Sequence, residues 1–148
     1  MDRPIKNDKV REELEYLARD LDPEEFLSKL PKEITLIEPS FPNVSCEQYV
    51  IGTSGFRHSI IAMYPKLDSL KAGDLALYDN EDLTVHIGRI QEDGYVISKW
   101  GTGGPVLKHP VDMVPISYGC CVFFRRISEE KLNEMKGKDI LQLFCRKG

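Results

Sequence analysis

Residues 70–78 read LKAGDLALY and residues 84–90 read TVHIGRI, and these two stretches decide the fold. The second stretch is rich in the β-branched residues that favour strands, and Gly73 indicates a turn before the first strand. The polar segment at 79–82 supplies a second turn between them. An antiparallel sheet is therefore predicted, with strands at 74–78, 84–91, 94–100 and 119–126.

Helical patterns flank these strands on both sides. Leu14 and Leu17 recur at helical spacing within 8–21, and a second short helix is expected to begin after Asp22 and end before Pro31. Further helices are predicted at 46–51, 128–135 and 139–144, whereas 56–70 is ambiguous and contains loop. The order predicts a single α+β domain over 1–148, in which N-terminal helices pack on a small antiparallel sheet. Its expected parts are a helical extension (1–40), a core (41–126) and closing helices (127–148).

The composition narrows the classes of function. The 148 residues are 41% hydrophobic and 30% charged, with a net charge of −4, and no basic face that would bind nucleic acid is evident. The first residues lack the apolar core of a secretory signal, and no apolar run approaches about 20 residues, so a cytoplasmic protein without a membrane span is expected. The four cysteines show no CxxC spacing, which predicts free thiols and neither a zinc site nor another cofactor.

Cys46 is the first candidate for chemistry. It opens the predicted helix 46–51 among polar neighbours, and Ser45 is suited to cap that helix. Backbone N–H groups at a helix N-terminus favour a thiolate and can hold an oxyanion. The alternative is the usual fate of a free cysteine, which is to be a small buried hydrophobe.

His86 is the second candidate, because it lies in the middle of a predicted strand. Gly88, two residues on, lies on the same face and is expected to leave room for a substrate. His58 and His109 are the competing bases, but one lies in the ambiguous segment and the other in a predicted loop before Pro110. A lone strand histidine is nevertheless more often structural than catalytic.

A third group must orient the imidazole, and the strand register decides which residue that is. A three-residue turn at 92–94 pairs Gly88 with Ser98, whereas a two-residue turn puts Lys99 on the face of His86. Since a cation orients an imidazole poorly, the three-residue turn and Ser98 are favoured. The glycine-rich run that follows Trp100 is expected to be a turn that lines a cleft, with Trp100 as one wall.

Residues 43–100 resemble the NlpC-type papain-like cysteine peptidases and the related CHAP amidases. The resemblance rests on Cys46 opening a helix, on the run AGDLAL at 72–77 and on the run HIGRI at 86–90. It implies a nucleophile at Cys46, a general base at His86 and an orienting group at Ser98, twelve residues after the histidine. The chain departs from the family at two positions. Ser45 stands before the nucleophile, where the family usually has Asp, and Ser98 stands at the third position, where the family usually has His, Asn or Gln.

The expected function is that of a cysteine hydrolase acting on an amide or ester, with a peptide, isopeptide or acyl substrate. Ser45, Tyr49 and Trp100 are the expected substrate-binding residues. The alternatives are an inactive domain of the same fold that binds a peptide or protein partner, and an acyltransferase-like thiol enzyme. The sequence gives no prediction of oligomeric state.

Overall fold

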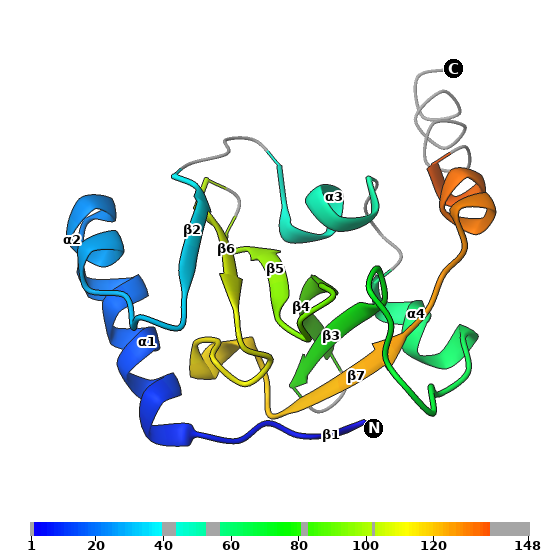
Figure 1. Ribbon diagram of the computed structural model, residues 1–148, viewed down its shortest axis with the longest axis horizontal. Coiled ribbons are helices and arrows are strands. Elements are labelled where there is room, and N and C mark those ends of the chain that lie inside the picture. Colours follow the sequence, from blue (N-terminus) through cyan, green and yellow to red (C-terminus); the bar gives the residue numbers. More distant parts are fainter. Residues whose placement is uncertain (1, 40–43, 53–56, 81–82, 102, 137–148) are drawn as a thin grey trace.

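The computed structural model describes residues 2–39, 44–52, 57–80, 83–101 and 103–136 and has the α+β architecture predicted from the sequence (Figure 1). The described strands form one antiparallel sheet of seven strands, in the order β1-β7-β3-β4-β5-β6-β2. They are β1 (Arg3–Pro4), β2 (Thr35–Glu38), β3 (Leu75–Asn80), β4 (Leu83–Ile90), β5 (Val96–Lys99), β6 (Val106–His109) and β7 (Cys121–Arg125). The helices are α1 (Asp8–Asp20), α2 (Pro23–Ser28), α3 (Cys46–Ile51), α4 (Arg57–Met63), the short 3-10 helix η1 (Ile116–Tyr118) and a helix at 129–136.

The local signals at the helix ends act as the sequence predicts. The Asp22 side chain accepts a hydrogen bond from the Glu25 N–H at 2.9 Å, and Pro23 occupies the first position of α2. Helix α4 forms within the segment that was ambiguous in the sequence. The helix predicted at 139–144 lies outside the described residues.

Three strands were not predicted. Each is short and pairs with a part of the chain far away in the sequence, although β6 also pairs with the nearby β5. Strand β6 occupies a stretch predicted to be loop, so the placement of His109 in a loop was wrong: it ends β6 and is fully buried. Its neighbour β2 pairs Thr35 with Lys108, and β1 pairs Arg3 with Val122. Pairing at such separation leaves no local sequence signal.

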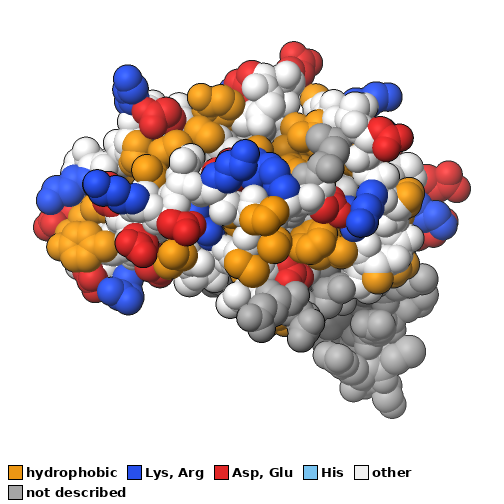
Figure 2. All heavy atoms as spheres, turned by 90° about the horizontal axis from the view of Figure 1, so that it is seen from below, with side chains coloured by type: hydrophobic (Ala, Val, Ile, Leu, Met, Phe, Trp, Pro, Cys, Tyr) orange, Lys and Arg blue, Asp and Glu red, His pale blue; other side chains and the backbone are white. Residues whose placement is uncertain are grey.

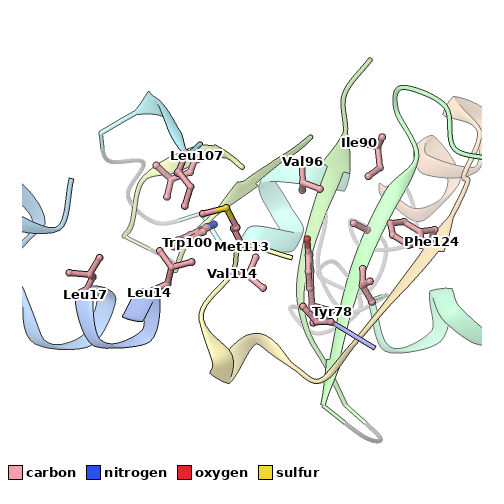
Figure 3. Close-up of a cluster of buried hydrophobic side chains, with 14 of the residues drawn as sticks. Leu14, Leu17, Tyr78, Ile90, Val96, Trp100, Leu107, Met113, Val114 and Phe124 are labelled. Carbon is pink, nitrogen blue, oxygen red and sulfur yellow. The ribbon is translucent and has the colours of Figure 1, made fainter. Parts of the chain in front are cut away.

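The sheet buries a hydrophobic core on each face, because alternate strand residues point to opposite sides. The first core packs α1 and α2 against residues such as Ala76, Tyr78 and Val96, and Figure 3 shows Leu14 and Leu17 on one side of it and Tyr78 and Val96 on the other. The second core packs α3, α4 and the 129–136 helix against the strand residues that point to the other face of the sheet. Its sheet members include Leu75, Leu77 and Ile87, and its helix members include Cys46, Val50, Ile60 and Leu132.

The turn between β4 and β5 sets the register near the candidate site. Gly94 adopts a φ of 84°, a conformation that favours glycine, and its N–H donates to the Gln91 carbonyl at 3.0 Å. Gly88 consequently lies opposite Ser98, which confirms the three-residue turn.

Gly88 is required by packing between strands, and the expected room for a substrate beside it is filled. A Cβ atom at this position would overlap Val96 Cγ1 and lie 3.0 Å from Ser98 Cβ. We expect Gly88→Ala to lower the free energy of unfolding by about 2 kcal/mol, because the added methyl group overpacks the β4–β5 pair. Urea unfolding monitored by circular dichroism measures this loss.

Gly103→Ala is the matched control, because a Cβ there meets nothing within 4 Å. We expect it to change the free energy of unfolding by less than about 0.5 kcal/mol. Equal effects of the two substitutions would contradict the packing role of Gly88.

The surface mixes charges of both signs. On the face shown in Figure 2, basic and acidic side chains are interspersed with hydrophobic ones, and no extended basic area is present on it. No helix among the described residues has the length and apolar character needed to cross a membrane.

Candidate functional site

Cys46 is the first residue of α3, where the sequence placed it. Ser45 caps this helix: its hydroxyl accepts from the Gln48 N–H at 3.1 Å, and the Gln48 side chain accepts from the Ser45 N–H at 3.0 Å. Cys46 is 8% exposed and packs in the second core with Leu77 and Ile87. The capping box thus fixes the start of α3 and the position of the thiol on the sheet.

His86 lies in the middle of β4, opposite Tyr78, and is 2% exposed. Its ring is flanked by two tyrosines, with centroids 5.4 Å from Tyr78 and 4.3 Å from Tyr118. The pKa of Tyr118 is raised above its ordinary value. Burial is the largest cause, and negative charge at Cys46 is the second. Tyr118 therefore contacts the His86 ring and lies within electrostatic range of Cys46.

Lys99 is a buried cation in the electrostatic surroundings of Cys46. Its side chain is fully buried, and Nζ donates to the Gly101 carbonyl at 2.6 Å. Burial lowers the pKa of Lys99 below its ordinary value, and negative charge at Cys46 opposes that shift. An ammonium group at this place stabilises a thiolate.

Ser98 belongs to a buried hydrogen-bond network with His109 and Trp100. The Ser98 hydroxyl lies 2.7 Å from His109 Nε2 and accepts from Trp100 Nε1 at 3.0 Å. Burial lowers the pKa of His109 to about 4, so the imidazole is neutral at pH 7. Its Nδ1 lies 2.8 Å from the Pro110 carbonyl, an acceptor only, so Nδ1 carries the proton and Nε2 accepts from Ser98. Ser98 thus has two partners of its own, and its role in orienting His86 stays a prediction.

A pocket of about 290 Å³ opens beside this network. Ala18 of α1 and Phe26 of α2 line one side, and Trp100 and Pro105 line the other. Tyr118 lines the pocket as well as contacting His86. Trp100 is therefore a wall of a pocket, as the sequence predicted.

The other two predicted substrate-binding residues lie elsewhere. The hydroxyl of Ser45 is engaged in the capping box of α3. Tyr49 is half-buried and lines a separate surface hollow with Arg89 and Ile97. Neither is among the described residues that line the pocket next to Trp100.

The sequence did not predict the contact of Tyr118 with His86 or the structural role of His109. The segment PISYG at 115–119 held a usable signal, because proline, serine and glycine are typical turn residues. Its N-cap Pro115 begins η1, which presents Tyr118 to His86. His109 carried no such signal, because its partner Ser98 is known only once β5 and β6 are paired.

Within the described part of the chain, no three His, Cys, Asp or Glu side chains are grouped so as to bind a metal ion. Cys46, Cys120 and Cys121 do not take part in a disulfide, and Cys145 lies outside the described residues. Comparisons of the chain with protein-family models, with curated proteins and with solved structures found no match.

Proposed function

We propose that the protein is a cysteine hydrolase that acts on an amide or ester. Cys46 is the nucleophile and His86 is the general base. The observation that carries the proposal is the position of Tyr118, which contacts the His86 ring, lies within electrostatic reach of Cys46 and lines the pocket.

The proposed reaction has two steps. The Cys46 sulfur forms a bond to the substrate carbonyl carbon, His86 accepts the thiol proton, and that proton then passes to the departing amine or alcohol. Water next attacks the thioester with His86 as base, which releases the acid and restores the thiol. Lys99 favours the negative charge that forms on sulfur once His86 has accepted the proton, because Lys99 is a buried cation within electrostatic range of Cys46.

A second candidate is a non-catalytic domain that binds a peptide or protein partner, and two observations favour it. The Ser98 hydroxyl is engaged by His109 and Trp100. Cys46 packs on the Ile87 side of the sheet, whereas His86 shares a face with Tyr78, since neighbouring strand residues point to opposite sides.

Thiol labelling separates the two candidates. We expect an alkyne-tagged iodoacetamide near neutral pH to modify Cys46 faster than the exposed Cys120, although Cys46 is only 8% exposed, because an activated thiolate outweighs limited access. His86→Ala is expected to slow this labelling by about a hundredfold or more. Peptide mapping by mass spectrometry assigns the modified cysteine.

The matched controls are Cys46→Ala and a Cys120→Ala/Cys121→Ala double variant. The first should lose the fast labelling and the second should keep it. Labelling of Cys46 at the rate of an ordinary buried thiol, unchanged by His86→Ala, would reject the hydrolase and leave the binding domain.

A further inference from the structure

The pocket beside Trp100 has rigid aromatic walls. The indole is held by its Nε1 bond to Ser98, and the Ser98 hydroxyl is in turn fixed by His109. Phe26 and Tyr118 lie against the same indole, with ring centroids at 6.0 Å and 5.8 Å. The pocket is thus preformed, and a ligand does not need to order its walls.

None of the described residues that line the pocket carries a charge. A charged group entering it would lose hydration without meeting a side chain of opposite charge, which disfavours lysine-like or carboxylate substituents. The rings of Phe26 and Tyr118 are tilted by 46° and 69° relative to the indole. An aromatic ring bound in the pocket can therefore contact both ring edges and ring faces.

The size of the pocket limits the ligand further. Cavities of about 150 Å³ bind benzene. A pocket of about 290 Å³ therefore has room for one aromatic ring together with the short chain that carries it. Tyr118 spans the distance from this pocket to His86, so the rest of the ligand would lie toward the proposed reactive groups.

We propose that this pocket binds a single uncharged aromatic side group of the substrate. An aromatic side group then defines the substrate class of the hydrolase suggested above, and this assignment to a substrate rests on that proposed function. Binding itself does not need Cys46, so the two can be tested apart.

Trp100 is the only tryptophan in the chain, so its fluorescence reports on the pocket directly. The probe is N-acetyl-phenylalaninamide, titrated into Cys46→Ala protein with excitation at the red edge of tryptophan absorption. We expect a saturable change in fluorescence. N-acetyl-lysinamide, the charged counterpart, should give no saturable change.

Ala18→Leu tests whether the signal comes from the pocket. Ala18 is exposed on α1 and lines the pocket, so a larger side chain there fills it without disturbing a buried contact. We expect about tenfold weaker binding of the phenylalanine amide. Ala62→Leu, the same change at an exposed position of α4, should bind as the parent does.

The outcomes separate the pocket from the chemistry. Saturable binding that Ala18→Leu weakens supports the pocket, even if the labelling experiment rejects the hydrolase. Absence of saturation with the phenylalanine amide, equal response to the lysine amide, or binding unaffected by Ala18→Leu would overturn the pocket proposal. A hydrolase confirmed by labelling would stand in each of those cases.

Discussion

Replacing Arg11 with methionine is expected to lower the free energy of unfolding by about 4 kcal/mol, the largest loss that we predict for a single side chain. Arg11 lies on α1 and is 2% exposed. Its guanidinium donates to the carbonyls of Val114 at 3.1 Å and Pro115 at 3.3 Å, and also to the Gly119 carbonyl. Methionine fills the space but removes the guanidinium donor from the Val114 and Gly119 carbonyls, whereas the Pro115 carbonyl keeps its hydrogen bond from the Tyr118 N–H at 3.0 Å.

Arg19→Met is the matched control on the same helix. The Arg19 side chain is 70% exposed and pairs with its neighbour Asp20, so its loss should cost less than about 0.5 kcal/mol. Urea unfolding of both variants at one pH compares them. Similar losses for Arg11→Met and Arg19→Met would show that the Arg11 network contributes little.

Arg11 also positions the site, because the carbonyls it binds surround η1. Tyr118 is the last residue of that element. A folded Arg11→Lys variant keeps the charge but not the fork of donors that reaches several carbonyls. We infer that the salt bridge to Asp8, at 3.9 Å, is secondary to these hydrogen bonds.

Acidification is expected to remove about 3 kcal/mol of stability through His109 as the pH falls from 6.5 to about 4. Burial depresses the folded pKa of His109 to about 4 from the 6.5 of the unfolded chain. Between those values the unfolded state binds a proton that the folded state does not. The contribution is therefore complete above pH 6.5, declines as the pH falls and changes no further below about 4.

His109→Gln isolates this effect, because glutamine does not titrate in this range. Urea unfolding at pH 7 and pH 5 should show a smaller acid loss in His109→Gln than in the parent protein. Tryptophan fluorescence gives a second readout, since protonation of Nε2 makes it a donor and disturbs the bond that holds the Trp100 wall. Equal acid losses in parent and variant would contradict the neutral buried imidazole.

The parts of the fold that follow local rules could be predicted from the sequence. Asp22 and Pro23 set the start of α2, Ser45 caps α3, and Gly94 fixes the turn that pairs Gly88 with Ser98. Each of these depends on residues that are near one another in the chain. Local chemistry therefore predicted both the start of α3 and the register of the strands beside it.

The parts that depend on contacts between side chains of different elements could not be predicted. His109 and Tyr118 reach the candidate site only when β6 pairs with β5 and η1 packs under α1. The role of Gly88 was also misjudged, because Val96 comes to lie beside it only across the hairpin. Trp100 was the exception, because it lines the pocket as the sequence predicted.

The origin of the two edge strands has a consequence for folding. Strands β1 and β2 close opposite edges of the sheet, yet both come from residues 3–38, whereas the strands between them come from 75–125. Neither edge strand can pair until the central strands have formed, because Thr35 of β2 pairs with Lys108 of β6 and Arg3 of β1 pairs with Val122 of β7. The N-terminal segment must therefore dock late and at both ends, a topology that slows folding and leaves β7 and β6 open as templates for other chains until it does.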